Sequence, residues 1–316
     1  MEYRNLGKSG LVVSAIGLGT NNFGGRTGRE QTEAVLCKAL DCGITCIDTS
    51  DSYPPGEPSG RSEEFIGEIL KAHRRDVILA TKFGSPMGEG PLWRGASRRY
   101  LYNAVQDSLR RLQTDYIDLY QVHFPDSATP IDETLRALDD LVRAGMIRYT
   151  GCSNFRAWQI IEAHWAARTG GTTQFISAQN PYSLLDRAVE AEVIPTCMKY
   201  GLGVLPFYPL ASGFLTGKYR RGEPAPEGTR LASGGRMAER TMTQENFATL
   251  QKLEEFAEAR GHTVLELAIA WLAAQPAVGS VIAGATTPEQ VEANVRAIEW
   301  SLTDAEVAEV STIAQP

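Results

Sequence analysis

Residues 44–83 read ITCIDTSDSYPPGEPSGRSEEFIGEILKAHRRDVILATKF and contain one full repeat of the architecture. The apolar runs at 44–48 and 77–83 have the length of buried β-strands. Between them lie a loop rich in Gly, Pro and Ser and a segment, 62–71, whose apolar residues have helical spacing. A strand, a helix and a second strand in this order predict a right-handed unit with two parallel strands.

The same order recurs on both sides of this stretch. Strands are expected to begin near residues 16, 44, 77, 116, 146, 175, 202 and 279. Helices are expected after them at about residues 30–41, 62–71, 97–112, 133–145, 157–168, 188–200, 263–275 and 288–300. Eight such units favour a closed barrel over an open doubly wound sheet. The predicted fold class is therefore α/β, a (β/α)8 TIM barrel, in a single domain over residues 1–316.

Two segments lie outside the regular repeat. YRNL (3–6) and LVVS (11–14), separated by GKSG, predict a β-hairpin ahead of the barrel. Residues 220–240 are polar and rich in Gly and Pro, which predicts a mobile loop over the mouth of the barrel. A helical segment at about 243–260 follows this loop, and we expect the next one, 263–275, to be the seventh barrel helix.

Composition narrows the class of protein. The chain has 31 Lys and Arg against 38 Asp and Glu, a net charge of −7, which argues against non-specific nucleic-acid binding but leaves room for a local pocket for a small anion. No apolar run approaches ~18 residues, so no membrane span is predicted. MEYRNLGKSG lacks the features of a signal peptide.

The five cysteines predict a reducing compartment. They show no C-x-x-C and no zinc-like spacing, so we expect small buried thiols in a cytoplasmic protein. They are Cys37, Cys42, Cys46, Cys152 and Cys197.

Ionisable and amide side chains gather where the predicted strands end. In a barrel of parallel strands these ends meet at one mouth. The residues concerned are Asp48, Tyr53 five residues after it, Lys82, His123, Ser153, Asn154 and Gln179.

This set suits the reduction of a carbonyl group. A ketone that accepts hydride needs a proton on its oxygen, and Tyr53 is the candidate donor. A free phenol has a pKa of ~10, and the Lys82 ammonium would lower it. Asp48 would keep Lys82 charged and oriented, and His123 would hydrogen-bond the carbonyl oxygen. Taken one at a time, Asp48 could also cap a helix or loop, and Tyr53 and His123 could simply pack in the protein. Lys82 is different, because a lysine at the end of an apolar strand needs a counter-ion.

The sequence lacks the motifs of a metal-dependent hydrolase, of a serine nucleophile and of a dinucleotide-binding fold. Only His123 of the four histidines lies at a strand end, and no H-E-x-x-H occurs, so a metal-dependent hydrolase has no ligand set. No G-x-S-x-G appears. GLGTNN (17–22) departs from the G-x-G-x-x-G pattern of dinucleotide-binding folds, and no helix opens directly from it.

Several stretches together resemble the aldo-keto reductase superfamily over essentially the whole chain. They are GLGTNNFGG, GITCIDTSDSYP, RSEEFIGEIL, ATKFG, IDLYQVH, RYTGCSNF, AQNPYSLL, YPLASGFLTGKY and GATTPEQVEAN. The resemblance implies a TIM barrel, NADPH as the hydride donor, no metal, and a catalytic tetrad of Asp48, Tyr53, Lys82 and His123.

The same motifs imply the cofactor contacts. Ser153, Asn154 and Gln179 match positions that hydrogen-bond the nicotinamide carboxamide, for which amide side chains supply donors and acceptors. Phe207 matches the aromatic residue that stacks on the nicotinamide. The pyrophosphate would be followed by Tyr208, Pro209, Leu210, Ser212, Gly213 and Leu215, with Lys218 near a phosphate. The adenosine side would be held by Gly284, Thr286, Gln290 and Asn294, and Gly19, Thr20 and Asn21 would line the mouth, with Asp48 also facing the cofactor.

The chain departs from one well-known pattern of this superfamily. Many relatives carry a Lys-Ser…Arg set near the eighth strand for the 2′-phosphate, where this chain has Gly284, Ala285 and Gln290. It is more similar to the branch with a long seventh loop, which includes potassium-channel β subunits. There Lys218, with Arg230 or Arg221, would pair with the phosphate. NADPH is the expected cofactor, with NADH possible.

The predicted function is the NAD(P)H-dependent reduction of aldehydes or ketones to alcohols, with a small-molecule carbonyl as substrate. The alternative is an NADPH-binding regulatory subunit that senses redox state and turns over slowly; compared with channel subunits, His123 is the enzyme-like residue. An apolar or aromatic carbonyl, or a sugar or polyketide ketone, suits the expected pocket walls. These are Asn22, Phe23, Tyr53, Trp93, Phe124 and the 220–240 loop.

Overall fold

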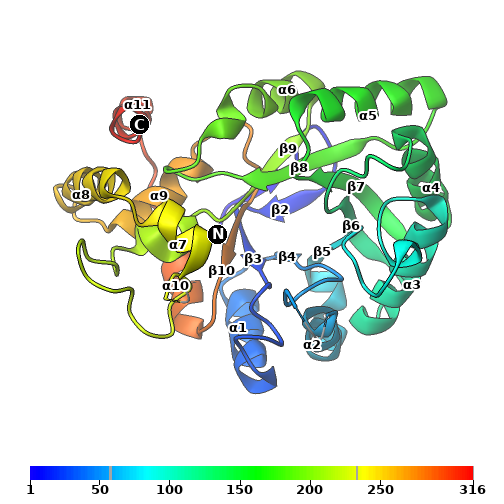
Figure 1. Cartoon of the computed structure of the whole chain (residues 1–316), viewed down its shortest axis with the longest axis horizontal. Helices are drawn as coiled ribbons and strands as arrows, with labels where there is room; N and C mark the ends of the chain where they lie inside the picture. The colour runs from blue at the N-terminus through cyan, green and yellow to red at the C-terminus, as the bar shows by residue number, and fades with distance from the viewer. Residues whose placement is uncertain (57–58, 233, 316) are drawn as a thin grey trace.

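The computed structural model describes residues 1–56, 59–232 and 234–315. Within them, eight parallel strands form one sheet in the order β10-β3-β4-β5-β6-β7-β8-β9, and a two-stranded hairpin, β1–β2, precedes it. The barrel strands are β3 (Ile16–Gly19), β4 (Cys46–Asp48), β5 (Ile78–Phe83), β6 (Ile117–Val122), β7 (Ile147–Ser153), β8 (Phe175–Pro181), β9 (Gly203–Phe207) and β10 (Val281–Gly284). Helices lie around the outside of the strands (Figure 1).

The helices follow the strands in the expected alternation. The α-helices are α1 (Arg29–Asp41), α2 (Arg61–Leu70), α3 (Arg98–Leu112), α4 (Ile131–Arg143), α5 (Ala157–Gly170), α6 (Val193–Tyr200), α7 (Gly235–Thr241), α8 (Gln244–Glu258), α9 (Val264–Ala273), α10 (Pro288–Ala297) and α11 (Asp304–Ile313). Short 3₁₀ helices are η1 (Lys71–Asp76), η2 (Pro91–Trp93), η3 (Ala188–Glu190) and η4 (Ala211–Thr216). The predicted (β/α)8 barrel with an N-terminal hairpin is confirmed.

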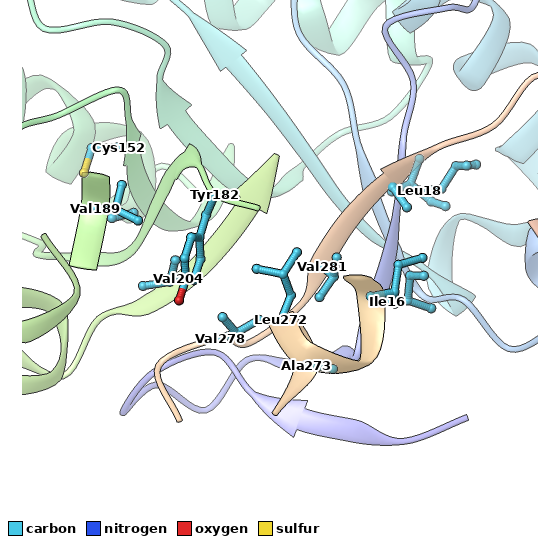
Figure 2. Close-up of a cluster of buried hydrophobic side chains, with 14 of the residues drawn as sticks. Ile16, Leu18, Cys152, Tyr182, Val189, Val204, Leu272, Ala273, Val278 and Val281 are labelled. Carbon is cyan, nitrogen blue, oxygen red and sulfur yellow. The ribbon is translucent and has the colours of Figure 1, made fainter. Parts of the chain in front are cut away.

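The barrel closes between β9 and β10. A parallel bridge joins Val204 to Val278, with backbone bonds of 2.7 Å from Val204 N to the Ala277 oxygen and 2.9 Å from Gly279 N to the Val204 oxygen. Figure 2 shows the apolar side chains at this seam, where Val281 of β10 lies between Ile16 of β3 and the side chains of α9. The strands are buried on both faces, which explains why they appear in the sequence as short continuous apolar runs.

The hairpin, β1 (Tyr3–Asn5) and β2 (Val12–Ser14), closes the end of the barrel where the strands begin. Leu6 is completely buried, and a Cβ placed on Gly203 or on Gly279 would lie 2.6 Å from its Cδ1. Two strand starts therefore need glycine at these positions for the Leu6 side chain to fit. The mouth at the other end is left for the polar residues.

Three details differ from the predictions. Residues 188–200 form η3 and then α6, because Pro195 lacks the N–H of a helix interior and fits only near the start of α6. The 220–240 segment, predicted as a loop, contains all but the last residue of α7 (Gly235–Thr241); its Ser233 lies outside the described residues. The helix α11 was not predicted, although Thr303 and Glu306 form a capping box at its start.

The cysteine prediction is half right. Cys46, Cys152 and Cys197 are buried, whereas Cys37 is exposed and Cys42 is partly exposed. Cys37 lies on the outer face of α1, where helical periodicity places one residue in each turn toward solvent. Across the described ranges, none of the helices combines the length and hydrophobicity needed to cross a bilayer.

Candidate active site

A cavity of about 1270 Å³ opens at the carboxyl ends of the strands. Every barrel strand, or the loop directly after it, contributes a lining residue: Gly19, Asp48, Ser85, His123, Ser153, Gln179, Phe207 and Gly284. The parallel topology brings these residues together although they are spread over most of the chain.

A buried ion pair lies at the base of the cavity. Lys82 Nζ is 2.6 Å from Asp48 Oδ2 and donates to the Thr49 carbonyl at 2.9 Å. The other Asp48 oxygen accepts from Gln121 Nε2 at 3.2 Å and Gln179 Nε2 at 2.9 Å. Because these groups come from β4, β5, β6 and β8, they meet inside the barrel. The carboxylate is thereby hydrogen-bonded on both oxygens.

Lys82 stays charged in this environment. Burial alone lowers the pKa of an ammonium, but the charge of Asp48, the neighbouring Tyr53 phenol and hydrogen bonds to both outweigh burial and leave the pKa of Lys82 above its usual value. The side chain of Lys82 has no exposed surface and does not line the cavity. Lys82 therefore acts on the cavity through its neighbours.

Tyr53 lies over Lys82, with the ammonium 5.0 Å from the centre of the phenol ring. Burial raises the pKa of Tyr53, and the nearby Lys82 charge offsets only part of that rise. The net direction is opposite to the lowering expected from the sequence, since the sequence reveals the ammonium but not how dry the phenol is. Tyr53 is accordingly protonated at neutral pH.

His123 faces Tyr53 across the cavity. The two ring centres are 5.9 Å apart and the ring planes are nearly perpendicular, at 82°. Burial, together with the Lys82 charge, lowers the pKa of His123 to about 3. The imidazole is therefore neutral, and its Nδ1 lies 3.1 Å from Ser50 Oγ and 3.2 Å from Ser85 Oγ.

The three residues predicted to hold a carboxamide lie on the next strands. Asn154 has left-handed backbone geometry, φ 62°, and its Nδ2 donates to the His123 carbonyl at 2.9 Å and to Ser153 Oγ at 3.1 Å. Gln179 Nε2 donates to Asp48 at 2.9 Å. Much of the donor capacity of the two amides is therefore used within the protein, and their carbonyl oxygens are the groups left to bind a ligand N–H.

The segment after β9 lines one long side of the cavity. Phe207, Tyr208, Pro209, Leu210, Ser212 and Gly213 all contribute to it. Tyr208, Ala211 and Ser212 have positive φ values of 55°, 45° and 60°, an unusual concentration of left-handed non-glycine residues. Such geometry concentrates at ligand sites. Leu215 is the exception among the predicted contacts: it is fully buried in the core and absent from the cavity wall.

Three cationic side chains also line the cavity, and Arg230 lies 5.6 Å from the centre of the Tyr208 ring in this wall. The three are Lys218, Arg230 and Arg26. Burial, followed by the charges of Arg26 and Arg230, lowers the pKa of Lys218. Arg230 donates to Asn21 Oδ1 and Asn22 Oδ1 at 3.1 Å each, and Arg26 donates to the Gly228 carbonyl. Mutual repulsion among these cations would be relieved by an anion between them.

The remaining predicted contacts lie on the β3 and β10 side. Gly19, Thr20, Asn21, Gly284, Thr286, Gln290 and Asn294 all line the cavity. Gln290 Oε1 accepts from the backbone N–H of Thr286 at 2.9 Å, and Thr287 caps the start of α10 with Pro288 in its first turn. The start of α10 is thus set at the cavity edge.

Some residues behave differently from the sequence-based expectation. Phe23 is buried in the core, Trp93 is exposed, and neither lines the cavity, whereas Asn22 and Phe124 do. Arg221 does not line it and bonds Gln244 instead. Ser50, Ser85, Gln121 and Arg26 were missed. Gln121 of β6 lies two residues before His123, which directly follows the strand, and this spacing was a periodicity signal; Arg26, in a glycine-rich loop, had none.

No metal site emerges from the described ranges, which contain no group of three or more His, Cys, Asp or Glu side chains placed to hold an ion.

A model of the Aldo/keto reductase family matches residues 15–315, which is the barrel together with α11. The chain belongs to this family. The aldo/keto reductase sequence is 36% identical over 305 residues to a probable voltage-gated potassium channel subunit beta of Oryza sativa subsp. japonica, covering 95% of this chain and 92% of that relative.

Two bacterial relatives match over similar lengths. An uncharacterized oxidoreductase, YrpG, of Bacillus subtilis (strain 168) is 37% identical over 309 residues, covering 96% of this aldo/keto reductase and 92% of the relative. The L-glyceraldehyde 3-phosphate reductase of Escherichia coli (strain K12) is 36% identical over 313 residues, covering 94% of this chain and 88% of the relative.

Proposed function

We propose that this oxidoreductase reduces aldehydes or ketones to alcohols with NADPH, and that Tyr53 is the proton donor. One observation carries the proposal: the Tyr53 phenol ring lies 5.0 Å from the ammonium of the buried Lys82–Asp48 pair and faces the His123 imidazole in one cavity. A donor, a charge to stabilise the donor's conjugate base and a second polar group are what carbonyl reduction requires.

The cavity suits a dinucleotide. Its lining combines Tyr53 with the amide and hydroxyl groups of Ser153, Asn154 and Gln179, the aromatic Phe207 and the cations Lys218, Arg230 and Arg26. Phe207 would stack on the nicotinamide, and the cations would meet the phosphates. When bound, NADPH supplies the hydride that reduces the carbonyl carbon.

The protein groups handle the proton. Tyr53 gives its hydroxyl proton to the carbonyl oxygen, which forms the alcohol O–H and leaves a phenolate. Lys82, held by Asp48, stabilises that phenolate until water returns the proton. Neutral His123 orients the carbonyl oxygen toward Tyr53 by a hydrogen bond.

Cofactor preference is tested by Lys218→Ala. Removing one charge-assisted contact to the 2′-phosphate is expected to raise KM for NADPH about 10- to 100-fold, since such contacts contribute about 1.5–3 kcal/mol. KM for NADH, which lacks that phosphate, should change little. Arg221→Ala, which removes a cation outside the cavity wall, is the matched control. Equal effects of Lys218→Ala on both cofactors would remove Lys218 from 2′-phosphate recognition.

Phe124 favours an apolar or aromatic carbonyl as substrate. Its ring is 51% exposed at the cavity and stacks on His123, with ring centres 4.6 Å apart and planes at 15°. The test is a panel of aromatic aldehydes, ketones and keto-sugars, with L-glyceraldehyde 3-phosphate included because of the named E. coli relative. If the protein oxidises NADPH with none of these compounds, the proposed reductase activity is contradicted.

A second candidate is a redox-sensing regulatory subunit, which the similarity to a probable potassium channel subunit beta favours. Such a protein would hold NADPH tightly and turn over slowly. The two functions differ in the number of turnovers. Sustained oxidation of many NADPH per protein without a partner supports the enzyme, whereas one slow turnover limited by cofactor release supports the subunit.

A further inference from the structure

The environment of His123 raises a question of tautomers. The imidazole is neutral, so only one of its two nitrogens carries a proton. Nδ1 faces two hydroxyls, at 3.1 Å from Ser50 and 3.2 Å from Ser85. No protein group in the described chain hydrogen-bonds Nε2, and His123 lines the cavity. To donate a hydrogen bond to a carbonyl, Nε2 must carry the ring proton. Nδ1 then has no proton and must accept a hydrogen bond from a hydroxyl.

The Ser50 hydroxyl is already committed to another acceptor. Its Oγ donates to Asp51 Oδ1 at 3.1 Å, accepts from the Ser52 N–H at 3.3 Å and also lies 3.1 Å from Ser52 Oγ. Once Asp51 is ionised, its carboxylate is the stronger acceptor, and the single hydroxyl proton of Ser50 is directed to it in a hydrogen bond. Ser50 can then only accept from Nδ1, which would favour the tautomer that leaves Nε2 without a proton.

The Ser85 hydroxyl has no competing acceptor. Within the described residues, His123 Nδ1 is the one partner of Ser85 Oγ, whereas the Ser85 carbonyl separately accepts from Tyr100 at 3.2 Å. Ser85 is itself buried, at 8% exposure. A buried hydroxyl proton with one acceptor within reach is directed to that acceptor.

We propose that Ser85 is a positioning residue that donates to Nδ1 of His123 and so fixes the tautomer with Nε2–H in the cavity. Ser50, when its proton is directed to Asp51, favours the other tautomer, with the proton on Nδ1. The inference rests on the proposed role of His123 as a hydrogen-bond donor, but the tautomer itself is measurable without activity.

The state of Asp51 sets the conditions of the test. Burial, with the charge of Glu63, raises the pKa of Asp51 to about 8. The groups facing it are Glu63 on α2, Arg111 and Tyr100 on α3, and Tyr120 on β6. At a pH about one unit above that value Asp51 is ionised and Ser50 opposes Ser85 most strongly, so the variants are best compared there.

The experiment is nitrogen-15 NMR of histidine-labelled full-length protein, which distinguishes protonated from bare ring nitrogens; His123→Asn identifies the His123 signals. Wild type and Ser85→Thr should show Nε2–H. Ser85→Ala should shift the proton to Nδ1, because Ser50 is then an unopposed acceptor. Ser50→Ala should keep Nε2–H, and the double variant Ser50→Ala/Ser85→Ala should return to it.

Kinetics give a second readout. Ser85→Ala should lower kcat/KM for the carbonyl about 10- to 100-fold with KM for NADPH unchanged, and Ser85→Thr should restore it. Retention of Nε2–H in Ser85→Ala, or its loss in Ser50→Ala, would overturn the assignment of Ser85. Failure of the reductase proposal shows separately, as a wild-type protein that consumes NADPH with none of the carbonyl compounds, and leaves the tautomer measurement valid.

Discussion

At the residue scale, the site depends on the Lys82 ammonium, which stays charged although it is buried inside the barrel. Lys82 is fully buried, yet Asp48 lies 2.6 Å away and is itself held by two glutamine amides. A pair with both partners hydrogen-bonded avoids the large penalty of an uncompensated buried charge. The charge of Lys82 also acts on the pKa values of Tyr53 and His123, and these pKa values determine how the reductase activity depends on pH.

The pH dependence of kcat for reduction should be flat from about pH 5 to 9. His123 has a lowered pKa of about 3, so it takes up a proton only when the pH falls toward that value. The pKa of Tyr53 is raised above its ordinary value of 10, so the proton donor is lost only above that value. Initial rates at constant ionic strength test this. A loss of kcat with an apparent pKa between 5 and 8, while the protein stays folded, would contradict the assigned protonation states.

The sequence predicted which residues would lie together here better than it predicted their pKa values. Lys82 ends an apolar strand, which demanded a counter-ion, and Asp48 on the preceding strand was the natural choice. The donors Gln121 and Gln179 reach Asp48 from across the barrel, and no local pattern reports such a distance. The pKa direction of Tyr53 was wrong because it depends on burial, which only the packed structure reveals.

At the scale of elements, a second buried pair joins α2 to α3. Glu63 is completely buried; its Oε2 accepts from Arg111 Nε at 2.7 Å and its Oε1 accepts from Thr81 Oγ1 at 2.6 Å. Thr81 directly precedes Lys82 on β5. The pair therefore connects two outer helices to the strand that carries the ammonium.

Arg111→Ala should lower the free energy of unfolding by about 3–5 kcal/mol, because it leaves the Glu63 carboxylate buried without its cation. Urea denaturation monitored by circular dichroism measures the change. Arg136→Ala is the control: it breaks an exposed pair with Asp132 and should cost less than about 1 kcal/mol. Equal losses in the two variants would show that the Glu63–Arg111 pair contributes no more than a surface contact.

Most elements were predictable because their signals are local. The strands begin within about two residues of the expected positions, since apolar runs and the polar residues that end them are adjacent in sequence. The pair of Glu63 and Arg111 was not predicted, because its partners lie 48 residues apart on different helices. The capping box of α11, Thr303 and Glu306, was a local signal that went unused.

At the scale of the whole molecule, the two ends of the barrel have different tasks. The cavity and its polar residues lie where the strands end, and the hairpin with Leu6 closes the end where they begin. TIM-barrel enzymes separate function and stability in this way. The closed barrel was predictable from the count of eight units, whereas the fit of Leu6 over Gly203 and Gly279 was not, because it joins segments far apart in sequence.

Leu6→Ala should therefore destabilise the protein without altering catalysis. The loss of a fully buried leucine is expected to cost about 2–5 kcal/mol in the free energy of unfolding. Turnover at a temperature where the variant remains folded should match wild type. Val12→Ala, at a 47% exposed position of the same hairpin, is the control and should change stability little. A large change in kcat for Leu6→Ala would contradict this separation of the two ends.

In the proposed reaction, Tyr53 delivers the proton to the carbonyl oxygen. The most direct test of this role is Tyr53→Phe, assayed with NADPH and 4-nitrobenzaldehyde alongside a fluorescence titration of NADPH binding. We expect kcat to fall about 10²- to 10⁴-fold, with NADPH affinity close to that of wild type. Turnover by Tyr53→Phe at the wild-type rate would contradict this role.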